Sequence, residues 1–281
     1  LYFFIFHYLP LARIAKIAKS YGNGVFDTPI AINRKDELGT ISDTMDAMAY
    51  ALDTLEKDQR KFLSNISHDL RSPLTSIRGY ANAIADGTIP TEEQKKYLEI
   101  IVYETMRLTK LTENLLALNT IGEKGLPIIY DTFDLNKVIR QTLAIFEGRC
   151  IEKNIIIDLI LTGNEMSVSA DEGKIRQVLS NLIDNAIKFS PEDSSIKIET
   201  TERNSKIYVS IKDNGIGIPK ESIRKIWDRF YKTDESRGQD KTGSGLGLSI
   251  VKEIIQAHDE NINVISTVGV GTEFIFTLKK V

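Results

Sequence analysis

The chain has 281 residues, of which 42% are apolar and 27% are charged, and its net charge is -3. This length accommodates two or three domains, and the composition is that of a soluble globular protein. Both signs of charge are interspersed with no long basic run, which excludes nucleic acid as an expected partner. The single cysteine, Cys150, excludes an internal disulfide framework and is interpreted as a buried thiol without a chemical role, in a reducing compartment.

The N-terminal stretch LYFFIFHYLP is apolar and aromatic and stops at Pro10. Residues 1–9 are too few to cross a bilayer, which takes about 20. Two interpretations are open, the end of a transmembrane helix or a buried helix of a soluble domain. Tyr2, His7 and Tyr8 suit a membrane interface. The character of the next segment favours the transmembrane interpretation.

Residues 11–40 predict a short amphipathic helix, then an extended connector. ARIAKIAK repeats its apolar residues at helical spacing, and Gly22 and Gly24 end the pattern. A second helix is predicted to begin near Asp36.

From Ile41 to Ile84 the apolar residues follow a heptad pattern in steps of four and three. Around Ile66 two steps of four follow one another, so the register slips as in a stutter. Thr91, with acidic residues behind it, predicts the start of the next helix. The apolar seam then resumes at Tyr97, Ile101, Leu108, Leu111, Leu115 and Leu118. A hairpin of two such helices cannot bury both faces alone, so we expect a dimeric four-helix bundle.

After residue 124 the periodicity changes. Segments typical of strands are PIIYDTF, NIIIDLIL, MSVSAD, SIKIETTE, KIYVSIKD, NINVIST and EFIFTLKK. Helices are predicted near 134–150, 171–189, 219–226 and 247–258. Strands and helices mixed without strict alternation predict a sheet with helices on one face.

The heptad count places His68 on the outward face and Pro73 on the seam. A lone histidine is usually a satisfied core residue, but this one is predicted to lie in solvent. A neutral imidazole can attack an electrophile, and Asp69 can ease the charge that develops on the second ring nitrogen. Pro73 cannot donate a helical hydrogen bond to the carbonyl of Asp69, so it loosens the backbone beside the histidine.

A second cluster lies on the predicted helix 171–189. Asn181, Asn185 and Lys188 share one face at spacings of four and three. Amide oxygens suit Mg²⁺ and an ammonium suits phosphate. Taken alone, such a face is more often a solvated surface.

Two further clusters are rich in glycine, DNGIGIP at 213–219 and KTGSGLGLSIV at 241–251. Glycines ahead of a helix let backbone amides approach anionic oxygens, although a single glycine loop is often only a turn. The polar segment between them has the composition of a lid over a nucleotide. Neither loop matches a Walker motif or the Rossmann fingerprint.

Together and in this order, these segments resemble a bacterial sensor histidine kinase of two-component signalling. SHDLRSPLT resembles the phosphoacceptor box of that family, and NLIDNAIKFS resembles its N box. DNGIGIP and GSGLGLSIV resemble its first and second glycine boxes, and IWDRFYK resembles its F box. Residues 10–27, PLARIAKIAKSYGNGVFD, with KDELG are similar to a HAMP linker, which in this family follows a transmembrane helix.

The resemblance implies a role for individual residues. His68 would be phosphorylated, Asp69 would be its acid/base partner, and Ser72 would position water for dephosphorylation of the regulator. Asn185 would ligate Mg²⁺, and Asp213 would accept a hydrogen bond from the adenine amino group of ATP. The full set of implied ATP-binding residues is Asn181, Asn185, Lys188, Phe189, Asp213, Gly215, Gly217, Arg229, Phe230, Gly243, Gly245, Leu246 and Gly247.

The resemblance also implies a multidomain architecture, with an all-α HAMP domain and dimeric four-helix bundle followed by a Bergerat-type α/β sandwich. The predicted boundaries are 1–9 for the end of a transmembrane helix, 10–60 for HAMP, 61–123 for the phosphotransfer hairpin and 124–281 for the ATP-binding domain. The implied cofactors are ATP and Mg²⁺. The implied partners are a second copy of the chain, the receiver domain of a response regulator, and the bacterial cell membrane, with the kinase core in the cytoplasm.

The sequence departs from the family pattern at three places. Ser72 stands where Thr or Asn is common, and Phe189 replaces a more frequent Tyr. The segment AHDENI lacks a usual glycine pair, so Asp259, Glu260 or Asn261 is expected to supply any left-handed turn residue.

Two alternatives belong to other functional classes. An ATP hydrolase or chaperone built on the same nucleotide fold would carry a glutamate at position 181 to activate water, where this chain has Asn181. A dimeric scaffold without chemistry would not need His68, Asn185 and both glycine boxes. The predicted function is therefore autophosphorylation of His68 from Mg-ATP, transfer to an aspartate of a response regulator, and a regulator phosphatase activity that depends on Ser72.

Overall fold

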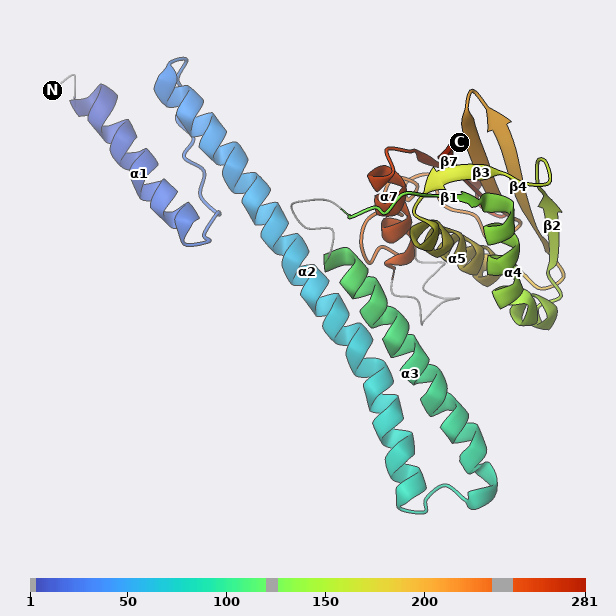
Figure 1. Cartoon of the computed structure of the whole chain (residues 1–281). Coiled ribbons are helices and arrows are strands. Elements are labelled where there is room, and N and C mark those ends of the chain that lie inside the picture. The colour runs from blue at the N-terminus through green and yellow to red at the C-terminus, as the bar shows by residue number, and fades with distance from the viewer. Residues whose placement is uncertain (1–3, 120–125, 234–244) are drawn as a thin grey trace. The chain divides into compact units, whose positions relative to one another are not determined.

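The computed structural model of the chain describes residues 4–119, 126–233 and 245–281 (Figure 1). Internal contacts divide the chain into two units, residues 1–71 and 72–281. The boundary falls inside the long helix α2 (Glu37–Ala85), and each unit is described by itself.

The first unit contains a π-helical turn η1 (Phe4–Tyr8), helix α1 (Leu9–Gly22) and the first part of α2. The predicted end of the first helix and start of the second are confirmed, since α1 ends at Gly22 and α2 begins directly after Asp36. A search of the described residues finds no helix that is both long enough and apolar enough to cross a bilayer.

The connector between α1 and α2 is attached to α2 through Asp46. The Asp46 carboxylate accepts hydrogen bonds from the backbone N–H groups of Ile30 and Ala31 at 2.7 and 3.0 Å and from the Tyr21 hydroxyl at 2.8 Å. Burial, together with the hydrogen bond to Asp46 and its charge, raises the pKa of Tyr21 to about 12. Ile30 is fully buried beneath this arrangement, which fixes an otherwise extended segment on the helices.

The second unit begins with the rest of α2 and helix α3 (Thr91–Asn119), which form the predicted hairpin. The turn between them is closed by a hydrogen bond from the Ile89 N–H to the Ala83 carbonyl and by the buried side chain of Ile89. The rings of Tyr80 and Tyr97 pack across the hairpin with their centroids 5.2 Å apart. The start of α3 at Thr91 is as predicted.

The remainder of this unit is a seven-stranded sheet with its helices on one face (Figure 1). The strands are β1 (Asp131–Asp134), β2 (Ile156–Ile160), β3 (Ser167–Ala170), β4 (Ser195–Arg203), β5 (Lys206–Asp213), β6 (Ile262–Thr267) and β7 (Gly271–Lys280). Their order is β1-β3-β7-β5-β4-β2, with β6 paired to β7. Only β2 and β4 run parallel among the described pairs.

The core lies between the sheet and helices α4 (Leu135–Glu152), α5 (Glu172–Phe189) and α7 (Gly247–Ala257). Alternate residues of the central strands are buried, as in Ile196 and Ile198 of β4, because successive side chains of a strand point to opposite faces. All seven predicted strands are present, and the predicted α/β sandwich following an all-α region is confirmed.

One predicted helix is wrong. Residues 220–227 form consecutive turns instead of the helix predicted at 219–226. Most hydrogen bonds there link residues three apart, as from the Ser222 N–H to the Pro219 carbonyl. The Ser222 hydroxyl also accepts from the Tyr231 hydroxyl at 2.9 Å. A segment this short gains little from helix propagation, so these tertiary contacts decide its conformation.

The turn after α7 contains the expected left-handed residue. Asp259 has φ +57°, a left-handed conformation that glycine adopts most readily.

Candidate functional site

His68 lies on the surface of α2, with 85% of its side chain exposed. Its Nδ1 lies 3.6 Å from Oδ1 of Asp69, which is longer than a hydrogen bond but close enough for electrostatic interaction once the ring is protonated. The predicted outward position is therefore confirmed for this chain. An exposed imidazole beside a carboxylate can act as a nucleophile whose developing charge is stabilised.

Two residues that follow His68 in α2 differ in burial. Ser72 is exposed and Pro73 is buried, as the heptad count predicts. Helix α2 continues through Pro73 without interruption. Because proline has no N–H, the Asp69 carbonyl lacks its usual helical donor, and this backbone acceptor lies next to the exposed histidine.

Helix α5 carries four of the predicted nucleotide-binding residues, Asn181, Asn185, Lys188 and Phe189. It starts at Asp171, whose Oδ1 caps the helix by accepting from the Lys174 N–H at 3.0 Å. Asn181 is 8% exposed, and its Nδ2 donates to the Gly247 carbonyl at 3.4 Å. This bond joins α5 to the N-terminus of α7, so the predicted N box and second glycine box meet in the structure.

The next turns of α5 present polar groups at the helix surface. Asn185 and Lys188 are both half-buried, one and nearly two turns beyond Asn181. The Lys188 ammonium lies 5.9 Å from the ring centroid of Phe189. A partly exposed amide and an ammonium in this order can contact a cation and phosphate oxygens.

Asp213 ends β5 and is only 6% exposed. Its Oδ1 accepts hydrogen bonds from the backbone N–H groups of Gly215 at 2.8 Å and Thr272 at 3.1 Å. Burial raises the pKa of Asp213, while these two hydrogen bonds act in the opposite direction. Among the described residues, Oδ2 has no hydrogen-bond partner, so this oriented carboxylate can accept from a ligand amino group.

The first glycine box packs directly against other backbone. A Cβ on Gly215 would lie 2.5 Å from the Phe189 carbonyl oxygen at the end of α5. Gly217 has φ +72°, and a Cβ there would lie 2.1 Å from the Thr267 carbonyl oxygen of β6. Only glycine fits these approaches, which hold the loop after Asp213 between α5 and the β6–β7 hairpin.

The F box joins the second glycine box through the backbone. The Phe230 N–H donates to the Gly245 carbonyl at 3.0 Å. Arg229 forms an ion pair with Glu253 of α7 at 2.8 Å, and Leu246 is fully buried ahead of Gly247. Gly243 lies outside the described residues. The structure thus gathers the other predicted ATP-binding residues around α5, the end of β5 and the start of α7.

The last two strands also contribute to the site, which the sequence motifs did not predict. Thr272 of β7 supplies one of the two N–H groups that orient Asp213, and the Ser266 hydroxyl of β6 accepts from the Ile218 N–H at 2.8 Å. The Thr272 donor is a backbone N–H, which every residue type except proline provides, so no residue type in the sequence could have indicated it.

The site offers polar groups that fit a Mg-nucleotide. The fit rests on the amide of Asn185, the ammonium of Lys188 and the Oδ2 of Asp213, which has no hydrogen-bond partner among the described residues. Amide oxygens suit Mg²⁺, and a carboxylate oxygen suits the adenine amino group. Within the described ranges, no group of three or more His, Cys, Asp or Glu side chains is arranged to hold a metal ion.

Three protein families match successive parts of the chain. Residues 9–53 match the HAMP domain, residues 58–124 the His Kinase A (phospho-acceptor) domain, and residues 170–281 the histidine kinase-, DNA gyrase B-, and HSP90-like ATPase family. The order of the matches is that of the predicted regions.

Curated relatives match across most of the chain. The sensor histidine kinase WalK of Bacillus subtilis is 36% identical over 227 residues, which cover 80% of this chain and 37% of that protein. The sensor histidine kinase YclK of the same organism is 30% identical over 97% of this chain and 59% of its own length. The chain therefore spans between 37% and 59% of the length of these relatives.

Solved structures give a similar result. A histidine kinase AdeS from Acinetobacter baumannii has a TM-score of 0.62 and 28% identity, covering 75% of this chain and 97% of that one. Histidine kinase ThkA, solved in complex with response regulator protein TrrA, has a TM-score of 0.63 and 30% identity, covering 79% of this chain and 61% of that one.

Proposed function

Because the chain belongs to the bacterial two-component sensor histidine kinases, we propose that it transfers the γ-phosphoryl group of Mg-ATP to His68 within a homodimer. The phosphoryl group then passes to an aspartate in the receiver domain of a response regulator. The proposal is carried by Asp213, a buried carboxylate whose Oδ1 is held by two backbone N–H groups and whose Oδ2 has no hydrogen-bond partner among the described residues. It is supported by the exposure of His68 in the other unit.

Each side chain has a distinct task in the proposed site. Asp213 accepts from the adenine amino group, and Lys188 lies along the phosphates. Mg²⁺, when bound, would be held through Asn185 and would neutralise charge on the phosphates. The buried bond from Asn181 to Gly247 keeps α5 and α7 together around the nucleotide.

In the proposed transfer, the γ-phosphoryl group moves from ATP to a ring nitrogen of His68. One ring nitrogen forms a bond to the γ-phosphorus while the bond to the bridging oxygen breaks, and ADP leaves with that electron pair. The carboxylate of Asp69 stabilises the positive charge that develops on the second ring nitrogen and takes its proton. In the second step the P–N bond breaks towards the imidazole, and the aspartate oxygen of the regulator takes the phosphoryl group.

Two further elements belong to the same proposal. Ser72, which is exposed one turn after His68, would orient water for dephosphorylation of the regulator. The HAMP region, proposed at 10–60, connects the kinase core in the cytoplasm to a membrane-spanning segment that ends near residue 9. The match to the HAMP family at residues 9–53 supports this connection. The proposed phosphotransfer hairpin is 61–123, and the ATP-binding domain is 124–281.

The test is phosphorylation of the purified chain with labelled Mg-ATP. We expect an acid-labile, base-stable phosphate that is lost in His68→Gln and in Asn185→Ala. His68→Gln should still bind a fluorescent ATP analogue, whereas Asn185→Ala should not. Ser72→Ala serves as the matched control on the same helix and should still be labelled. Persistent labelling of His68→Gln would show that the phosphoacceptor has been assigned wrongly, and no labelling of the unaltered chain would favour a scaffold without chemistry.

A further inference from the structure

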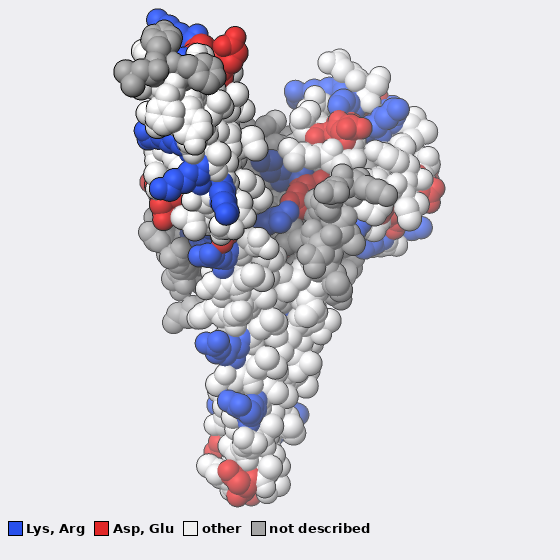
Figure 2. Space-filling model, turned by 90° about the vertical axis from the view of Figure 1, so that its left-hand side faces the viewer, with Lys and Arg blue, Asp and Glu red and all other residues white. Residues whose placement is uncertain are grey.

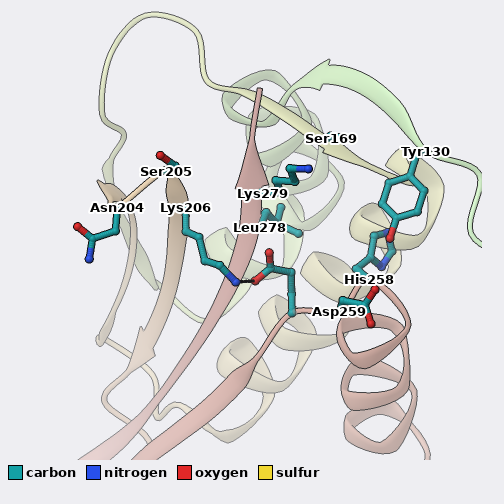
Figure 3. Close-up of a pocket in the computed structure, with 10 residues that line it drawn as sticks. Tyr130, Ser169, Asn204, Ser205, Lys206, His258, Asp259, Leu278 and Lys279 are labelled. Atoms are coloured by element: carbon teal, nitrogen blue, oxygen red, sulfur yellow. Dashed lines mark hydrogen bonds and ion pairs between the residues drawn. The ribbon is translucent and has the colours of Figure 1, made fainter.

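A cavity lies at the opposite end of β5 from Asp213. It has a volume of about 650 Å³, and its walls include Tyr130, His258 and Lys206 (Figure 3). Lys206 starts β5 and Asp213 ends it, so the full length of this strand separates the cavity from the proposed adenine contact. Lys206 forms an ion pair with Glu260 at 2.7 Å across one side of the cavity. The other side is formed by His258 with Tyr130 packed edge-on at 5.6 Å.

The hydrogen bonds of His258 fix the roles of its two ring nitrogens. Its Nδ1 lies 2.8 Å from the Ile254 carbonyl oxygen, which can only accept, so Nδ1 is the donor. Its Nε2 accepts from the backbone N–H of Asp171 at 3.0 Å. With 6% exposure, the ring is held in place by two backbone groups, one in α7 and one at the N-cap of α5.

Asp171 is a junction of three segments. Its backbone N–H reaches His258 at the end of α7, and its Oδ1 caps α5. Its Oδ2 accepts from the backbone N–H of Ile129 at 3.2 Å, in the segment that leads into β1. His258, Asp171 and Ile129 are called the junction below.

Helices α5 and α7 are thus tied at two points. One tie is the junction bond from Asp171 to His258, and the other is the bond from Asn181 to Gly247. The ties lie at 171 and 181 along α5 and at 258 and 247 along α7, so the two helices run antiparallel. With a rise of about 1.5 Å per residue, the two ties are about 15 Å apart along α5 and about 16.5 Å apart along α7. Two ties at similar spacings on both helices oppose sliding of one helix along the other.

We propose that His258 is a positioning residue for the nucleotide site. Through its Nε2 it sets the axial position of α5 against α7, and so the placement of Asn181 and Asn185 along the helix. Asn181 lies about 15 Å and Asn185 about 21 Å beyond the Asp171 contact along α5. A shift of α5 would displace these amides relative to the second glycine box, where the nucleotide is proposed to bind. The inference rests on the proposed function, because it assigns the nucleotide to this site.

The experiment uses two variants that differ by one methylene group. In His258→Gln the amide oxygen reaches the place of Nε2 and can accept from the Asp171 N–H. In His258→Asn the amide reaches only the Ile254 carbonyl. Affinity for a fluorescent ATP analogue with Mg²⁺ is measured on the full chain carrying His68→Gln, so that no phosphoryl transfer intervenes. We expect affinity near that of the parent for His258→Gln and about tenfold weaker for His258→Asn.

Two further variants separate positioning from general stability. Ile129→Pro removes the donor to Asp171 Oδ2 but leaves both ties between α5 and α7, and should keep parental affinity. If His258→Asn does not fold, His258→Phe takes its place, because it keeps a ring but has no acceptor. Amide hydrogen exchange at Asp171 should be slow in the parent and in His258→Gln and faster in the variants without an acceptor.

Equal affinities among folded His258 variants would overturn the inference and leave the assignment of His68 untouched. Failure of the parent chain to bind the analogue would reject the proposed function, and with it this inference. Weaker binding by His258→Asn with recovery in His258→Gln supports both.

Discussion

At the scale of single residues, Asp213 shows how burial and hydrogen bonding oppose one another. Burial disfavours the carboxylate, and the N–H groups of Gly215 and Thr272 favour it. Because burial dominates, the pKa of Asp213 is raised in the folded chain. A carboxyl group whose pKa is raised by folding stabilises the fold at any pH below its pKa in the unfolded chain. This stabilisation is lost as the pH rises through its pKa in the folded chain.

Asp213→Asn removes this charge and keeps an oxygen for both N–H groups. Between pH 4 and pH 7 we expect the stability of Asp213→Asn relative to the parent to rise, since only the parent must bury a carboxylate. The free energy of unfolding, measured in urea across this pH range, checks the expectation. A relative stability that falls with pH would contradict it. The substituted amide places a donor where the proposed adenine amino group needs an acceptor, so ATP-analogue affinity should fall at least about tenfold.

At the scale of elements, the loop after β5 is shaped by the β6–β7 hairpin. The Gly269 N–H donates to the Ile216 carbonyl at 2.8 Å, and Gly217 packs on the Thr267 backbone. The two glycines have nearly the same backbone conformation, with φ +72° for Gly217 and +76° for Gly269. They differ in surroundings, because a Cβ on Gly269 would meet nothing within 4 Å.

Alanine substitutions at Gly217 and Gly269 distinguish the cost of backbone strain from the cost of a steric clash. Gly269→Ala should cost about 1–2 kcal/mol, the strain of a left-handed alanine. Gly217→Ala should cost more, because its Cβ would also force the hairpin away from the loop. Urea unfolding of both variants gives the comparison, and ATP-analogue affinity should fall only in Gly217→Ala. Equal losses of stability in the two variants would show that the β6–β7 hairpin moves away from the Gly217 Cβ at no cost in free energy.

At the scale of the whole molecule, the helical hairpin leaves a second apolar stripe uncovered. Leu98, Val102 and Met106 recur every four residues along α3, and each is at least half exposed. Figure 2 shows a face on which much of the hairpin surface carries few charges. A stripe of this kind, in addition to the seam that the hairpin itself buries, supports the proposed four-helix dimer.

Val102→Glu should weaken this dimer, because association would bury an unpaired carboxylate. We expect the concentration for half-dissociation to rise at least about tenfold, measured by sedimentation equilibrium. Val102→Thr keeps the shape of the side chain without a charge, so it should remain largely dimeric at the same concentrations. A chain that sediments as a dimer in spite of Val102→Glu would place the interface elsewhere.

Local periodicity was sufficient for most of the architecture. The heptad seam placed His68 outside and Pro73 inside, and alternation located all seven strands. These features depend on residues close in sequence, whose side chains repeat with the period of the helix or strand. The helix expected at 219–226 was wrong because contacts from Tyr231 and nearby backbone outweigh the weak propensity of a short segment.

The sequence by itself determined the order of helices and strands, the outward position of His68 and the residue types expected around a nucleotide. Only the tertiary structure decided how these residues are oriented. The two N–H groups on Asp213, the tie from Asn181 to Gly247 and the contact of His258 with Asp171 join segments between 2 and 87 residues apart. Backbone donors carry no side-chain signature, and their partners are set by the packing of α5 and α7 on the sheet. The residue types in the sequence therefore indicated the chemistry, whereas only the folded chain determined how the side chains of the site are oriented.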